Sequence, residues 1–187
     1  HVHLEGSIQP ETLLMLARRH GVALPADTAE GLRAWYTFTD LAHFLQVYRL
    51  VSACIRTPDD IELIAREFLA GQAAQNIAYT EVTYTAYTHY LYRGLAFADQ
   101  LAALNRARAW AAQALGVRCG IVIDIDRGMD AAKSSLVADW AIAAAGDGVV
   151  ALGLGGDEFG NPPEKHQPAF ARAHAAGLPC VPHAGET

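Results

Sequence analysis

The stretch GVRCGIVIDIDRGMDAAKSSLVADWAIAAAGDGVVALGLGG, residues 116–156, contains two apolar runs on either side of an alanine-rich segment. The runs at 117–125 and 149–156 are short and rich in β-branched residues, which favours buried strands. The segment between them, 130–145, has the composition of a helix, and Gly146 follows it as a residue suited to a helix end. A strand, a helix and a second strand in this order predict parallel strands joined by a crossover helix.

The same alternation continues on both sides of this stretch. Further strand-like runs lie at 76–84 and 178–185, and helical patterns cover 97–115 and 164–176. A doubly wound sheet and a (β/α)8 barrel both fit this order, although a complete barrel needs about 250 residues. Four strands, plus a fifth whose end would be His1–Leu4, would form about five-eighths of a barrel.

The part of the chain before residue 76 has a helical pattern. Segments at 10–21, 40–54 and 58–75 are expected to be helices, and Thr57-Pro58-Asp59-Asp60 is typical of a helix start. These helices separate the opening residues from the next predicted strand. No linker or repeat interrupts the chain, so residues 1–187 are expected to form a single domain.

The composition excludes several classes of protein. The chain has 187 residues, of which 52% are hydrophobic and 18% charged, as in a folded globular domain. Its net charge of −6 argues against nucleic-acid binding, and no apolar run is long enough to predict a membrane span. The three cysteines, Cys54, Cys119 and Cys180, are scattered and are expected to be free thiols, so we predict a cytoplasmic location.

Two groups of histidine and glutamate lie at the two ends of the chain. His1 and His3 are two positions apart, so on a strand their imidazoles would point to the same face and could bind one metal ion. His183 ends a strand-like run, and Glu186 follows three residues later, where a carboxylate could carry a proton. Taken alone, each group is equally compatible with polar residues at a terminus or in a loop.

A glycine-rich segment follows the third strand-like run. Gly155 and Gly156 would let a ligand approach the backbone closely, and the segment does not match a nucleotide-binding fingerprint. Asp157 and Glu158 come next and could equally be solvated acids of a turn. This segment and the two histidine groups all fall at carboxyl ends of predicted parallel strands, which is the catalytic face of a barrel.

Three motifs together resemble a known family. HVHLEGSIQPETLL (1–14), GLGGDE (153–158) and HAGE (183–186) are similar, in this order, to motifs of the adenosine deaminase family within the amidohydrolase superfamily. The resemblance spans the whole chain. It implies an α/β fold of the TIM (β/α)8 barrel class, of which this chain covers roughly the first five strands plus extra helices after strand 1.

The resemblance also implies roles for particular residues. His1, His3 and His183 would bind one Zn²⁺ per full-length subunit, and Glu186 would protonate N1 of an aminopurine. Gly156 would offer its backbone N–H to purine N3. The expected substrate-binding residues are Glu5, Gly156 and Asp157, with Leu41, Phe44, Leu45 and Tyr48 on a helix that covers the substrate. Helical spacing places those four on one face, which could also be an ordinary core face.

Zinc-dependent deamination of a 6-aminopurine is therefore the expected function, with adenosine as the first choice of substrate. Adenine and aminodeoxyfutalosine remain alternatives, as do another amidohydrolase reaction and a non-catalytic barrel without metal. Glu5 stands where many adenosine-specific members have an aspartate that contacts the ribose. The family's zinc-binding aspartate and water-orienting histidine are expected beyond residue 187, so the chain is expected to be incomplete at both ends. His89 could face the site after the strand at 76–84, but it is interpreted as a loop residue. The sequence does not indicate an oligomeric state.

Overall fold

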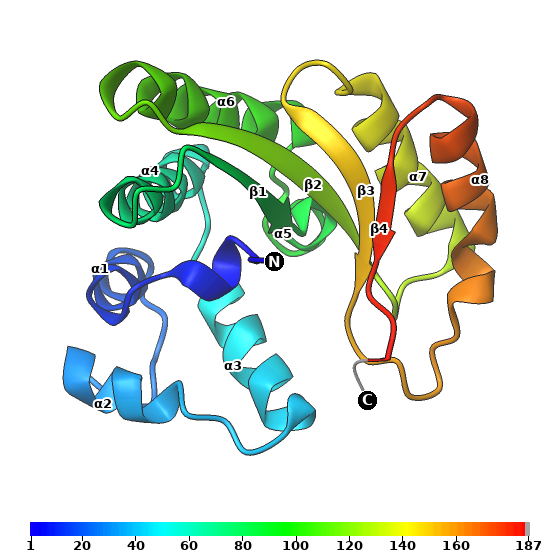
Figure 1. Ribbon diagram of the computed structural model, residues 1–187. Coiled ribbons are helices and arrows are strands. Elements are labelled where there is room, and N and C mark those ends of the chain that lie inside the picture. The colour runs from blue at the N-terminus through cyan, green and yellow to red at the C-terminus, as the bar shows by residue number, and fades with distance from the viewer. Residues whose placement is uncertain (186–187) are drawn as a thin grey trace.

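The computed structural model describes residues 1–185, and its centre is a parallel sheet (Figure 1). Four strands pair in chain order, each parallel to the next: β1 (Tyr79–Tyr84), β2 (Arg118–Asp126), β3 (Val149–Gly155) and β4 (Cys180–Pro182). Seven consecutive residues of β2 are buried, as expected for a strand covered on both faces. The predicted parallel α/β fold is confirmed, with strand ends close to the predicted ones.

The opening residues extend this sheet beyond β1. His3 forms a parallel bridge with Thr83, the Leu4 N–H donates to the Thr83 carbonyl at 2.8 Å, and the Thr83 N–H donates to the Val2 carbonyl at 2.8 Å. The segment then turns into a short 3-10 helix, η1 (Glu5–Ser7). The expected fifth strand end is therefore present, and it places His1 and His3 at the carboxyl edge of the sheet.

Helices cover the outer side of the curved sheet (Figure 1). Packing joins α4 to α6 and α7 to α8, and α7 also contacts β2 and β3. The covering helices are α4 (Pro58–Ala74), α6 (Phe97–Ala114), α7 (Ala131–Ala143) and α8 (Gln167–Ala175), the last preceded by the 3-10 helix η2 (Pro163–His166). No helix within residues 1–185 is both long and apolar enough to cross a membrane.

The helical part before β1 contains α1 (Pro10–His20), α2 (Ala29–Trp35) and α3 (Leu41–Ala53). The sequence predicted α1 and α3 but not α2. Helix α2 has only seven residues, and its start depends on the Thr28 hydroxyl accepting a hydrogen bond from the Gly31 N–H at 3.1 Å. Such a short helix has too few turns to give a clear apolar period.

A second helix that the sequence did not predict follows β1. Helix α5 (Ala86–Arg93) contains His89, which is 1% exposed, so the interpretation of His89 as a loop residue is wrong. Aromatic and β-branched residues dominate this helix, and both classes have modest helix propensity. Its stability comes from packing, because Tyr87 is buried and the His89 ring stacks on Tyr84 with ring centres 5.3 Å apart.

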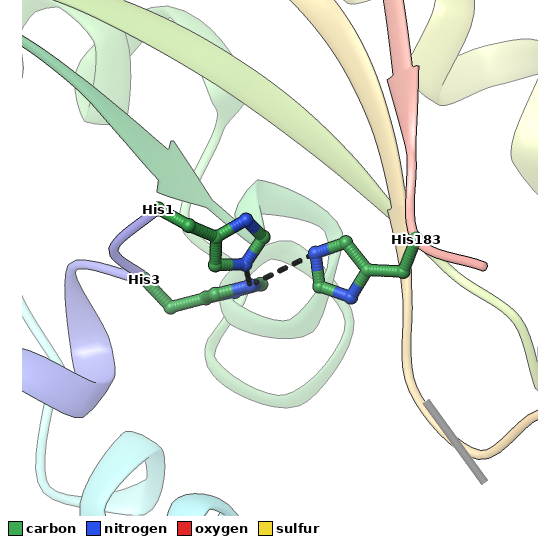
Figure 2. Close-up of side chains that lie close together, drawn as sticks. All are labelled: His1, His3 and His183. Carbon is green, nitrogen blue, oxygen red and sulfur yellow. Dashed lines mark hydrogen bonds between the residues drawn. The ribbon is translucent and has the colours of Figure 1, made fainter. Parts of the chain in front are cut away.

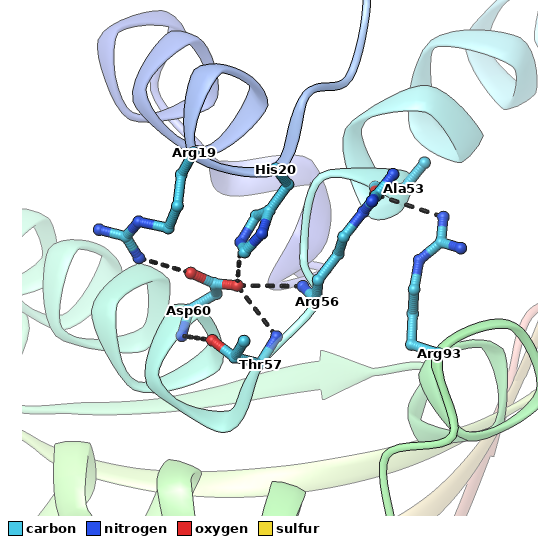
Figure 3. A network of polar contacts seen from close by, with 7 residues as sticks. All are labelled: Arg19, His20, Ala53, Arg56, Thr57, Asp60 and Arg93. Carbon is cyan, nitrogen blue, oxygen red and sulfur yellow. Dashed lines mark hydrogen bonds and ion pairs between the residues drawn. The ribbon is translucent and has the colours of Figure 1, made fainter.

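A buried carboxylate joins α1 to the start of α4 (Figure 3). Asp60 is fully buried and accepts hydrogen bonds from Arg19 Nη1 at 2.6 Å, from the N–H of Arg56 at 3.1 Å and from the N–H of Thr57 at 3.0 Å, while His20 Nε2 lies 2.7 Å away. Burial alone would raise the pKa of Asp60, but these donors outweigh it and hold the pKa below its usual value. We call this group the Asp60 hub.

Candidate metal centre

Three histidines from opposite ends of the chain meet at the carboxyl edge of the sheet (Figure 2). His1 and His3 come from the segment beside β1, and His183 directly follows β4. The His183 N–H donates to the Leu154 carbonyl of β3 at 2.8 Å, which continues the pairing of β3 and β4 to this residue. Parallel strands thus bring together side chains that are 180 positions apart in the sequence.

The separations between the ring nitrogens fit a zinc ion. The Nε2 atoms of His1 and His3 lie 3.2 Å apart, and those of His3 and His183 lie 3.4 Å apart. One nitrogen from each ring lies within 4.8 Å of the other two. Tetrahedral zinc with Zn–N bonds of about 2.0–2.1 Å would hold its nitrogen ligands roughly 3.3–3.4 Å from one another. The donor type and two of the three separations therefore suit zinc.

A cavity of about 740 Å³ lies in front of the histidines. Most of the predicted substrate-binding residues line it, together with residues that the sequence analysis did not single out, such as Asp124, Asp126, Arg49 and Arg93. The predicted residues on its wall are His1, His3, Phe44, Leu45, Tyr48, Gly156, Asp157 and His183. Two others, Leu41 and Glu5, are not among the lining residues within the described part of the chain.

Glu5 is buried beside α5 and not on the cavity wall. Its side chain is 1% exposed, and Oε1 accepts from the Thr85 N–H at 3.0 Å and lies 3.3 Å from His89 Nε2. Burial alone would raise the pKa of Glu5, but His89 and the backbone donors outweigh it, so the pKa is lowered and Glu5 is a carboxylate. The HLEG motif drew attention to Glu5, but no sequence signal linked it to His89.

Tyr48 brings a hydroxyl to the cavity from α3. Its Oη lies 3.3 Å from the Thr85 Oγ1, and its ring lies beside His3 with ring centres 6.2 Å apart. Burial raises the pKa of Tyr48 well above its usual value, and the nearby Glu5 carboxylate raises it further. The side chain is therefore a neutral phenol that can both donate and accept hydrogen bonds.

The two predicted glycines lie at the end of β3, next to His183. A Cβ atom at Gly155 would lie 2.8 Å from Asp124 Oδ2 and 3.3 Å from His183 Cε1, so only glycine leaves room for both side chains. Gly156 has φ of 103°, a backbone conformation that favours glycine. The proposed proton carrier, Glu186, lies outside the described residues.

The chain is similar to known proteins along its whole length. The family model for adenosine deaminase matches residues 1–187. The chain is 36% identical over 186 residues to the adenine deaminase of Rhodospirillum rubrum. The matched region covers 100% of this chain and 55% of that protein. The chain thus spans little more than half the length of this curated relative.

Solved structures share the fold. The crystal structure of adenine deaminase from Arthrobacter aurescens superposes with a TM-score of 0.89 at 33% identity, covering 99% of this chain and 56% of that chain. An amidohydrolase from Burkholderia ambifaria with bound Zn superposes with a TM-score of 0.90 at 29% identity, covering 99% of this chain and 50% of that one. The predicted barrel class is confirmed by these neighbours. Because the adenosine deaminase family model matches the whole sequence, the chain belongs to the adenosine deaminase family.

Proposed function

We propose that the full-length protein containing this chain is a zinc-dependent deaminase of a 6-aminopurine base, with adenine as the substrate. The observation that carries the proposal is the meeting of three imidazoles on the wall of one cavity, with two pairs of ring nitrogens 3.2 and 3.4 Å apart. In this position zinc would supply Lewis acidity and lower the pKa of water towards neutrality. His1, His3 and His183 would hold it.

The remaining residues would bind and protonate the purine. Phe44 and Leu45 form an apolar part of the cavity wall and would cover the ring, and Gly156 would offer its N–H to N3. Glu186 would carry a proton to N1, which makes C6 a better electrophile for water. The C6–O bond would form and the C6–N bond would then break as the amino group takes up a proton and leaves as ammonia. The neutral hydroxyl of Tyr48 would form a hydrogen bond in the site without adding charge.

Two observations favour adenine over adenosine, which was the first choice from the sequence. The relatives with the strongest sequence similarity described above are named adenine deaminases. In addition, the Glu5 carboxylate stands where a ribose contact was expected, but it is buried and accepts from Thr85 and His89. The Glu5 side chain is 1% exposed and does not line the cavity, so its carboxylate is not offered to a ribose hydroxyl there, which supports a base as the substrate.

Zinc analysis and an ammonia-release assay on the full-length protein test this function. We expect about one zinc per subunit and release of ammonia from adenine with kcat/KM at least roughly tenfold higher than from adenosine. Aminodeoxyfutalosine serves as the third substrate, and the His183→Ala variant as the inactive control. A zinc-loaded protein that releases no ammonia from any of the three would refute the proposal, and a preference for adenosine would refute the choice of base.

A further inference from the structure

A buried arginine, Arg127, directly follows β2 and lies next to the HAGE segment. Its side chain is 1% exposed, although guanidinium groups are rarely buried unless they are paired. One nitrogen, Nη2, donates both to Glu158 Oε1 at 2.9 Å and to the backbone carbonyl of His183. The side chain therefore links the segment after β3 to the segment after β4.

Glu158 completes the link to the same segment. Its Oε1 also accepts from the Gly185 N–H at 3.1 Å. The backbone of His183 is thereby held on both sides, because its N–H donates to Leu154 of β3 and its carbonyl accepts from Arg127. Residues 183 and 185, on either side of Ala184, are each bonded to one member of an ion pair between the buried Arg127 and the partly buried Glu158.

Arg127 is itself fixed in place. Its N–H donates to the Gly155 carbonyl at 2.9 Å, and its own carbonyl lies 3.2 Å from Nε2 of the fully buried His166. Hydrogen bonds at both the N–H and the carbonyl of Arg127 therefore hold the backbone from which the guanidinium extends. A buried ion pair generally adds little net stability over apolar side chains of the same size, so stability is a weak reason for this arrangement.

We propose that Arg127 and Glu158 are positioning residues for the metal centre, an inference that rests on the proposed function in its metal-binding part. By holding the backbone at His183 and Gly185, they fix the direction in which the His183 imidazole leaves the chain. They also fix the residue from which the chain continues to Glu186. Groups that orient metal ligands typically change metal affinity or activity by about 10–100-fold when they are removed.

Hydrogen–deuterium exchange on the metal-free, full-length protein tests the first half of this inference. We expect Arg127→Met to speed exchange of the amides at 183–185, because the carbonyl contact and the orientation of Glu158 are lost. Asp60→Asn removes an equally buried charge from the hub at the start of α4 and serves as the matched control. Unchanged exchange at 183–185 in Arg127→Met would overturn the proposal. So would an equal increase at these amides in Asp60→Asn beyond the increase that this variant shows over the rest of the chain.

Zinc affinity by chelator competition tests the second half. We expect Arg127→Met to raise the zinc Kd by about 10–100-fold, Arg127→Lys to recover part of that loss, and Asp60→Asn to leave the Kd unchanged. If Arg127→Met does not fold, Glu158→Gln takes its place with the same expected direction. Equal zinc Kd values in wild type and in the folded variant would overturn the positioning role. Failure of the wild type to bind zinc would refute the proposed function. The exchange measurement would still decide whether Arg127 and Glu158 hold the backbone at residues 183–185.

Discussion

The histidine cluster and the Asp60 hub both gather polar side chains from distant segments, yet they are built in opposite ways. In the hub, one buried carboxylate meets donors from α1 and from the start of α4, so the chain itself supplies the opposite charge (Figure 3). In the cluster, three imidazoles turn ring nitrogens toward one another (Figure 2). The first arrangement is suited to holding helices together, and the second is suited to binding a cation.

The largest expected effect comes from removing a ligand of the cluster. In the full-length protein, His183→Ala should abolish zinc binding at micromolar zinc and lower kcat for deamination roughly a thousandfold or more, since bound zinc supplies several kcal/mol of transition-state stabilisation. Metal analysis and ammonia release measure this. The thermal unfolding temperature of the metal-free variant should stay close to that of the metal-free wild type. If the variant keeps both zinc and activity, His183 is not a ligand of the metal.

The second effect concerns the hub. Asp60→Asn should lower the free energy of unfolding by about 3–5 kcal/mol, because it leaves buried donors without their charged partner. Urea unfolding of the full-length protein measures the loss, and kcat on the folded fraction should be unchanged. A drop in kcat without a loss of stability would mean that the Asp60 hub serves catalysis and does not hold the helices together.

The hub also predicts a pH dependence. Since the pKa of Asp60 is lowered in the folded state, its contribution to stability is complete above the unfolded pKa of about 3.9 and is lost as pH falls through the folded pKa. The difference in unfolding free energy between wild type and Asp60→Asn should therefore be constant near neutral pH and shrink below about pH 4. A difference that grows on acidification would contradict the assignment of Asp60 as the buried anion.

A smaller effect is expected from one added methyl group at the cluster. The Cβ of Gly155→Ala would lie 2.8 Å from Asp124 Oδ2 and 3.3 Å from His183 Cε1, so one of these side chains must move. A displacement of a reacting group by about 1 Å can lower the rate roughly a hundredfold, and we expect kcat/KM to fall by about 10–100-fold. Activity equal to that of the wild type would show that this glycine does not constrain the histidine.

The smallest effect provides the matched control for that substitution. Gly71 lies inside α4, and an added Cβ there meets no atom within 4 Å. Gly71→Ala should therefore raise the free energy of unfolding by about 0.5–1 kcal/mol through helix propensity, with kcat/KM unchanged. Denaturant unfolding measures the gain, and a loss of stability would mean that the helix packs more closely there than the structure indicates.

The residues that could be predicted from the sequence are those whose position follows from strand geometry. His1, His3 and His183 end strands, and parallel strands bring their ends to one edge, so their meeting could be expected. The start of α4 was also predictable, because Thr57 and Asp60 form a capping box with local hydrogen bonds.

The contacts that could not be predicted join residues far apart in the sequence with no local signature. Glu5 meets His89 across 84 positions, on a helix whose aromatic residues do not indicate a helix. Arg127 has no motif around it, and its importance is visible only when the His183 carbonyl is placed beside it. Leu41 was placed on the cavity wall by the family resemblance and by helical spacing, but it is not among the residues that line the cavity.

The most direct test of the metal centre is anomalous diffraction at the zinc edge from crystals of the full-length protein. We predict one strong peak within about 2.0–2.1 Å of the Nε2 atoms of His1, His3 and His183. The same crystals of His183→Ala should show no such peak. A zinc peak at any other position, with these three nitrogens bonded only to one another, would contradict the account.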